Sequence, residues 1–207
     1  MCFLDREVET SVRAFIAIPL PADLKAKLST VQQQFRVIPS EATWVREVEF
    51  HITLKFLGEV EVAQIEPITS CLRAAVHSCA PFSLTFCGVG VFPHEHSPKV
   101  LWVGVAEETG RLRRLQREVE QRLTHIGFPQ EDRAFAAHLT LARLKRVSQR
   151  GKFLECLKEH RDTIFGHMDV HHIELLESQL HPAGARYSTV KVIPLQESTE
   201  ASEIPHS

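Results

Sequence analysis

Two short motifs in the chain combine residue types that are suited to acid and base chemistry. One reads His-Ile-Thr-Leu at residues 51–54, and the other reads His-Leu-Thr-Leu at residues 138–141. In an extended strand, residues two apart point the same way, so His51 shares a face with Thr53, and His138 with Thr140. The residues between them face the opposite side. This division predicts two strands that present polar atoms to a groove and apolar atoms to a core.

The four polar side chains match the needs of phosphodiester hydrolysis. Histidine titrates near pH ~6.5, so a pair can hold one imidazole neutral as a general base and the other protonated as a general acid. The Thr53 and Thr140 hydroxyls can donate hydrogen bonds to the non-bridging phosphoryl oxygens. This chemistry requires no metal ion and no cofactor. We therefore predict a metal-independent phosphodiesterase with His51, His138, Thr53 and Thr140 at its site.

Two basic residues near the motifs are candidate phosphate partners. Lys55 continues the parity of the first motif, so its ammonium is expected to face the groove. Arg143 has the opposite parity to the second histidine, but a bulge or turn near the strand end could re-aim its guanidinium. Either could instead be an ordinary solvated charge. Phe56 lies on the apolar face by parity and is expected in the core rather than as a platform for base stacking.

A metal site is the alternative that the other histidines raise. His94 and His96 have a His-x-His spacing that could bind a metal, but no third ligand is evident and a solvated loop is favoured. A zinc hydrolase would also need carboxylate or cysteine ligands near the motifs, and the sequence offers none there.

The two motifs belong to an internal repeat. The two histidines lie 87 residues apart, and the same offset relates Arg13 to Val100 and Phe82 to Asp169, which are expected strand starts. The predicted order is strand, helix, motif strand, helix, strand, repeated once, with a last strand that closes the second hairpin. Two similar lobes related by a pseudo-twofold axis would place the motifs face to face across a groove.

Periodicity and turn residues assign the elements of each repeat. Helices are expected over residues 21–35, 61–79, 108–126 and 150–162. Extended segments are expected at residues 13–20, 43–45, 51–57, 82–91, 100–105, 137–143, 168–180 and 186–195. We expect one bilobal domain over residues 11–196, with flexible tails at 1–10 and 197–207.

Bulk composition limits the partners and the compartment. With 207 residues, 43% of them hydrophobic, the chain can bury a proper core as one domain or two tightly joined lobes. Its formal charge of −2 gives no strong general attraction to polyanions, so if nucleic acid is the substrate, a short piece or an end suits it better than a long duplex. The five cysteines have no C-x-x-C spacing, which favours a reducing, cytoplasmic setting. Without a signal peptide or an 18-residue apolar run, no membrane partner is expected.

At these residues the sequence resembles the RNA 2′,3′-cyclic phosphodiesterases, historically also called 2′-5′ RNA ligases, of the two-histidine phosphoesterase superfamily. The resemblance extends over most of the chain. It includes R-A-F-I-A-I-P-L at 13–20, E-F-H-I-T-L-K-F-L-G at 49–58, G-V-G-V-F-P at 88–93, V-L-W-V-G-V at 100–105 and R-A-F-A-A-H-L-T-L-A-R at 133–143. The family often has Pro before the second histidine, where this chain has Ala137, and the first ten residues fall outside the match.

The resemblance implies a bilobal α+β fold, with two antiparallel sheets lining a central groove and helices outside. It implies opening of a terminal 2′,3′-cyclic phosphate to a 2′-phosphate, on RNA 3′ ends or nucleoside 2′,3′-cyclic phosphates, by a monomer. His51 would donate the proton to the leaving 3′ oxygen, and His138 would accept the proton of water. The sequence alone leaves these two roles open, because the motifs are near-equivalent and coupled histidines share their titration.

Two other functions remain on the same fold. A 2′-5′ RNA ligase would run the chemistry backwards, but it must hold a second RNA end, and no additional basic surface is evident in the sequence. A non-catalytic RNA-end-binding protein would be favoured if either motif lacked its histidine, and both histidines are present.

Overall fold

The computed structural model describes residues 11–179, 181 and 184–196, and the predicted tails at 1–10 and 197–207 lie outside these residues. Its helices are α1 (Ala22–Arg36), α2 (Ile65–Val76), α3 (Arg111–Thr124) and α4 (Arg150–Glu159), with short 3-10 turns at Glu47–Glu49 and Val62–Gln64. Its strands are β1 (Ser11–Pro19), β2 (Ser40–Trp44), β3 (His51–Glu61), β4 (Phe82–Phe92), β5 (Val100–Ala106), β6 (His138–Val147), β7 (Ile164–Val170), β8 (His172–Gln179) and β9 (Arg186–Pro194).

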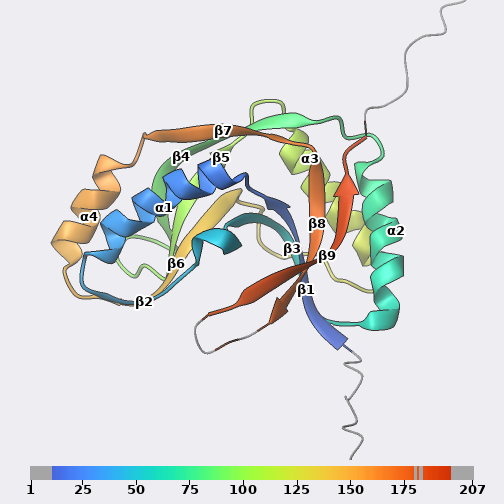
Figure 1. The fold of residues 1–207 in the computed structure, drawn as a ribbon, viewed down its shortest axis with the longest axis horizontal. Coiled ribbons are helices and arrows are strands. Elements are labelled where there is room, and N and C mark those ends of the chain that lie inside the picture. Colours follow the sequence, from blue (N-terminus) through green and yellow to red (C-terminus); the bar gives the residue numbers. More distant parts are fainter. Residues whose placement is uncertain (1–10, 180, 182–183, 197–207) are drawn as a thin grey trace, which may run out of the picture.

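The strands form one antiparallel sheet with the order β7-β4-β5-β6-β3-β1-β8-β9, and β2 adds to β6. Its two halves meet where β3 pairs with β6, at the single residue pair Ile52 and Leu139. The predicted α+β class is confirmed. The two predicted sheets are the halves of this one sheet, which bends between β3 and β6 (Figure 1).

The helices cover the sheet in two pairs. α2 and α3 pack together against β9 and β3, while α1 and α4 pack together near β7 (Figure 1). Each amphipathic helix contributes its apolar stripe to one continuous core, in which Phe35 of α1 meets Phe153 of α4 edge to face at 5.6 Å. No helix within the described ranges is long and apolar enough to cross a membrane.

The predicted repeat is present, with an exchange of elements between the halves of the sheet. β1, β3 and α2 of the first repeat lie in one half, while α1 and β4 of the same repeat pack in the other. The second repeat does the reverse. Its β5, β6 and α4 lie in the half that contains β4, while α3 and β8 lie in the half that contains β1 and β3.

One predicted strand is wrong. The segment 168–180 was expected to be continuous, but the chain breaks after Val170 and forms β7 and β8. β7 pairs with β4 at one edge of the sheet, whereas β8 pairs with β1 and β9 in the other half. The chain changes partners across the single residue His171, so the hairpin partner of β9 is β8 alone.

The contact between β3 and β6 predicts a large stability effect. Leu139 is fully buried, and Leu139→Ala removes apolar contacts at the junction of the two halves. We expect the free energy of unfolding, measured by urea titration, to fall by ~2–5 kcal/mol. The control Val192→Ala truncates a strand residue that is 56% exposed. It should change the free energy of unfolding by less than ~0.5 kcal/mol. Equal effects of the two substitutions would contradict the central role of the junction.

Candidate active site

The two predicted motifs lie at the starts of the two central strands. His51 opens β3 and His138 opens β6. Ile52 and Leu139 pair with each other and are both fully buried, so they point into the core. If this register continues by one residue in each direction, His51 lies opposite Thr140 and Thr53 lies opposite His138. These four side chains then lie on the face away from the core. The structure therefore brings the four predicted polar side chains to one face of the sheet.

Both imidazoles are oriented by the same local contact. His51 Nδ1 lies 2.7 Å from the carbonyl oxygen of Glu49, and His138 Nδ1 lies 2.7 Å from that of Ala136. A carbonyl only accepts, so in each ring Nδ1 carries the hydrogen and donates it. This tautomer leaves Nε2 as the nitrogen available for chemistry. Thr53 Oγ1 lies 3.0 Å from Nε2 of His51 and can donate to it.

His51 sits among aromatic rings. Its ring centroid lies 4.9 Å from that of Phe15 and 5.2 Å from that of Tyr187, which meets it edge to face. Burial by these neighbours lowers the pKa of His51 to about 4. The hydrogen bond to Glu49 opposes this shift, while the positive charges of Lys25 and His138 add to it. His51 is consequently a neutral imidazole at pH 7 in the free protein.

His138 faces a cavity of about 470 Å³. The ring of Phe92 stands edge to face on its imidazole at 5.1 Å, and Trp102 lies 5.0 Å from Phe92 in turn. Arg113 from α3 lines the same cavity. The two histidines therefore have different surroundings, although their backbone positions are equivalent.

A bulge in β6 re-aims Arg143, although this residue lies in the middle of the strand and not near its end as expected. Trp102 pairs with Thr140 but Leu101 pairs with Ala142, so Leu141 is the extra residue. Leu141 and Ala142 are both buried, and the next residue, Arg143, is exposed. The added residue restores Arg143 to the parity of the second motif. The Leu141 carbonyl accepts a hydrogen bond from Gln32 of α1 at 2.9 Å, which holds the bulge in place.

An equivalent bulge in β3 overturns the predicted position of Lys55. Ala17 pairs with Thr53 and Ile16 with Lys55, so Leu54 is the extra residue and Lys55 turns into the protein. Its ammonium is buried, 2.6 Å from Glu120 Oε2 of α3 and 2.7 Å from the Pro129 carbonyl. The expectation that Lys55 faces the groove as a phosphate partner is wrong.

The same bulge corrects the expectation for Phe56. Parity placed this side chain in the core, but it is 57% exposed. Its ring centroid lies 6.0 Å from that of Phe15. Phe56 thus occupies the position in β3 that Arg143 occupies in β6.

Sequence reasoning missed several side chains near His51. Tyr187 comes from β9, and its pKa is raised by burial and by Glu49, while Arg143, Arg13 and Arg46 oppose the shift. Three guanidinium groups therefore act at this end of the site. Of these residues only Arg143 was expected near the site, because Tyr187, Arg13 and Arg46 come from separate strands and loops and no motif in the sequence marks them.

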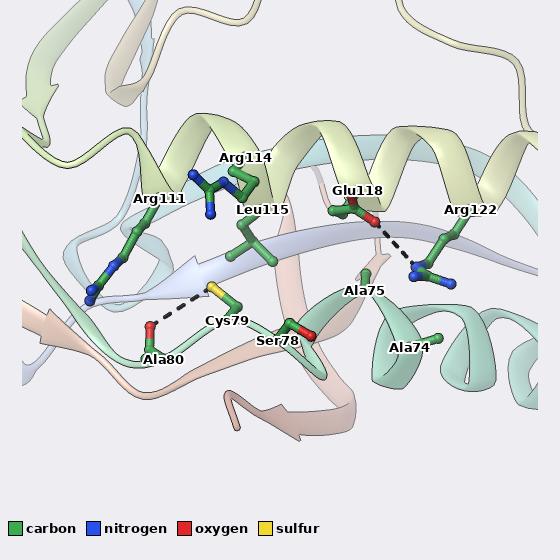
Figure 2. A pocket seen from close by; sticks show the side chains of 10 residues that line it. All are labelled: Ala74, Ala75, Ser78, Cys79, Ala80, Arg111, Arg114, Leu115, Glu118 and Arg122. Carbon is green, nitrogen blue, oxygen red and sulfur yellow. Dashed lines mark hydrogen bonds and ion pairs between the residues drawn. The ribbon is translucent and has the colours of Figure 1, made fainter. Parts of the chain in front are cut away.

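Other clusters in the structure lie apart from the motifs. A cavity of about 390 Å³ between α2 and α3 is lined by Cys79, Arg111, Arg114 and neighbours, and contains neither motif histidine (Figure 2). Over the described ranges, no three His, Cys, Asp or Glu side chains gather as metal ligands.

Comparison with known proteins settles the family. Residues 20–182 match the model described as the 2′-5′ RNA ligase superfamily. The chain belongs to this superfamily. The predicted family is therefore confirmed, and the two His-x-Thr strands lie within the matched segment.

Superfamily members similar to this chain over nearly their whole length carry the name RNA 2′,3′-cyclic phosphodiesterase. The protein of Methanothermobacter thermautotrophicus is 32% identical over 89% of this chain and 99% of its own. That of Archaeoglobus fulgidus is 34% identical over 87% of this chain and 99% of its own.

Solved structures of the superfamily share the fold. Thermus thermophilus TT0787 superposes with a TM-score of 0.76 at 27% identity, over 89% of this chain and 98% of that chain. Escherichia coli LigT in complex with 3′-AMP gives 0.70 at 23% identity, over 90% and 99%.

The lowered pKa predicts how His51 titrates. In NMR spectra of the free protein, the His51 ring signals should shift with a midpoint at about pH 4. Because the unfolded chain titrates near pH ~6.5, it binds more protons between these values. The stability contributed by neutral His51 is complete above pH ~6.5 and is lost as the pH falls toward 4. His51→Phe should remove the loss of stability that His51 causes between pH ~6.5 and 4. An NMR midpoint of His51 at pH ~6 or above would contradict the lowering of its pKa by burial.

The buried ion pair predicts that Lys55 matters for stability. Lys55→Met leaves the Glu120 carboxylate buried without its partner, and should lower the free energy of unfolding by ~3–5 kcal/mol. The double variant Lys55→Met/Glu120→Leu removes both charges and should recover most of that loss. Urea unfolding curves check both. If the double variant is as unstable as Lys55→Met, the contribution of Lys55 to stability does not come from its ion pair with Glu120.

Proposed function

We propose that this protein hydrolyses the 2′,3′-cyclic phosphate at the 3′ end of RNA to a 2′-phosphate, without a metal ion. The observation that carries the proposal is the paired geometry of the motifs. Two histidines on the central strands hold the same tautomer, each with a threonine on the same face, and Nε2 of His51 lies beside the hydroxyl of its threonine. The names of the superfamily members similar over their whole length agree with this activity.

The pseudo-twofold arrangement suits an in-line displacement at phosphorus. A phosphate between the two strands would have one imidazole on the side of the attacking water and the other on the side of the leaving oxygen. As water attacks, Nε2 of His138 takes its proton. The bond from phosphorus to the 3′ oxygen then breaks, and His51 gives that oxygen a proton. The phosphate remains on the 2′ oxygen, and the histidines exchange protons with solvent before the next turnover.

His51 needs a proton to act as the acid, although it is neutral in the free protein. An anionic phosphate beside the imidazole favours its charged form and raises its pKa. His51 is therefore charged by binding the substrate, at the stage where the leaving oxygen requires a proton. His138 holds the same tautomer, so its Nε2 can accept the proton of water and act as the base that the family resemblance assigns to it.

The remaining groups stabilise the developing charge on phosphorus. Thr53 and Thr140 can each donate to a non-bridging oxygen, and such charge-assisted hydrogen bonds contribute ~1.5–3 kcal/mol. Arg143, re-aimed by the bulge in β6, offers a guanidinium on the same face.

The setting proposed for this reaction is the cytoplasm, with the protein acting as a monomer. The cysteines in the described residues, Cys71, Cys79, Cys87 and Cys156, are free thiols, which fits a reducing compartment.

The product and the histidine variants test the proposal together. Phosphorus NMR of adenosine 2′,3′-cyclic phosphate treated with the protein should show the 2′-phosphate as product. His51→Ala and His138→Ala should each lower the rate by ~10²–10⁴-fold, because each removes one proton transfer. EDTA should leave the wild-type rate unchanged.

A matched control separates catalysis from folding. His125→Ala changes an exposed histidine at the end of α3 and should keep full activity. Circular dichroism should show that all three variants are folded. Full activity in both motif variants, a 3′-phosphate product, or an EDTA loss restored by zinc would each overturn the proposal.

A further inference from the structure

The cavity between α2 and α3 lies apart from the motif histidines and has no part in the proposed reaction. Its volume of about 390 Å³ is within the range of small-molecule sites. The space exists because α2 and the turn after it contribute only small side chains to the wall: Ala74, Ala75, Ser78, Cys79 and Ala80. The opposite wall comes from α3 and includes three arginines. The two helices therefore enclose a space with one small-residue wall and one basic wall.

The charges in this cavity are divided unevenly between its two ends (Figure 2). At one end, Glu118 lies 3.5 Å from Arg122, so these two charges largely cancel. At the other end, Arg111 and Arg114 flank the Cys79 thiol, and neither forms an ion pair within the described part of the chain. Both arginines are exposed, so a ligand can reach them from solvent. The positive charge of the cavity is thus concentrated at this second end.

The groups nearest to these two arginines do not neutralise them. Glu107 is the carboxylate that acts on Cys79 together with them, but its oxygens cap the start of α3, where they accept backbone hydrogen bonds at 2.7 and 3.2 Å. Burial raises the pKa of the Cys79 thiol, although Arg111 and Arg114 oppose the shift, so this thiol is neutral at pH 7. The two guanidinium groups are therefore left for an external anion.

Arg111 is already positioned for such an anion. Its Nη1 donates to the Pro81 carbonyl at 2.9 Å, which ties the guanidinium to the segment between α2 and β4 and leaves its other N–H groups available. Arg114 comes three residues later, so it lies on the same side of α3, about 4.5 Å further along the helix axis. Two guanidinium groups at this spacing can donate to the oxygens of one phosphate.

The remaining surface of the cavity suits a compact organic group. Leu115 and Ala75 face each other beside the two arginines and offer apolar contact to a ring or a short chain (Figure 2). A phosphomonoester carries a charge of about −2 above pH ~7 and three terminal oxygens. It therefore matches both guanidinium groups, whereas the diester phosphates of a nucleic acid carry a single charge each.

We propose that this cavity binds a small phosphomonoester, with the phosphate between Arg111 and Arg114 and the organic part against Leu115 and Ala75. The site is separate from the motif histidines, so the inference goes beyond the proposed function and does not depend on it.

Phenyl phosphate is the probe, because it combines a phosphate with one compact apolar ring. Backbone amide NMR follows its binding at pH ~7.5, where the phosphate is mostly doubly charged. The Ser78 and Cys79 signals should shift and saturate. Arg114→Ala removes one of the two guanidinium groups and should weaken binding about tenfold or more. Arg117→Ala is the matched control, since it removes an exposed arginine of the same helix that lies outside the cavity, and it should leave binding unchanged.

Two further measurements test the class of ligand and its placement. Phenyl sulfate has a similar shape with a single negative charge, and it should bind about tenfold more weakly. Ala74→Leu fills space from the α2 wall without changing a charge. It should weaken the binding of phenyl phosphate and leave that of inorganic phosphate unchanged. Circular dichroism should show that all three variants are folded.

Several results would overturn the inference while the proposed function stands. One is the absence of saturable shifts at Ser78 and Cys79, including the case in which only signals near the motif histidines respond. The others are an equal loss in Arg114→Ala and Arg117→Ala, equal affinity for phenyl phosphate and phenyl sulfate, or unchanged affinity for phenyl phosphate in Ala74→Leu.

Discussion

The site depends on one contact, the pairing of Ile52 with Leu139 where the two central strands meet. Both side chains are fully buried, so the opposite faces of β3 and β6 are fixed as the faces that carry the motifs. A slip of one residue in this pairing would turn a histidine and its threonine toward the core and expose apolar residues instead. Burial at the junction therefore enforces the alignment that acid and base catalysis needs.

The two bulges make this nearly symmetric site asymmetric. Each strand has its extra residue directly after the threonine of its motif, and the residues that follow differ in type. In β6 they are Ala142 and the exposed Arg143, while in β3 they are the buried Lys55 and the exposed Phe56. One half thus presents a cation beside its motif, and the other presents an aromatic ring. The aromatic packing that lowers the pKa of His51 adds to this difference, so equivalent histidines can take different roles.

The sequence was sufficient to predict features that depend on local periodicity. The shared face of His51 and Thr53, the repeat offset and the helices all follow from spacing along the chain. The bulge at Leu54 could not be predicted in this way, because no glycine or proline marks it. The faces of Lys55 and Phe56 are therefore exchanged without a local signal in the sequence. The burial of Lys55 depends on Glu120, which approaches only when α3 packs on β3.

The division of residues 168–180 was equally hidden. Its apolar pattern continues through the break, and the change from one half of the sheet to the other takes place across the single residue His171, which no local signal marks. Similarly, Tyr187 reaches His51 from a strand more than a hundred residues later, so no short pattern could connect them.

The exchange of elements between the halves has a consequence for the origin of the fold. Neither repeat could close a core alone, because its first helix and its last strand pack on the other repeat's strands. Two separate copies of one repeat could satisfy these contacts only as a symmetric dimer that swaps those same elements. A gene fusion of such a swapped dimer would turn its symmetry axis into the pseudo-twofold axis between the two histidines. In that view the face that carries the two motifs began as a subunit interface, and joining the chains allowed its two sides to diverge.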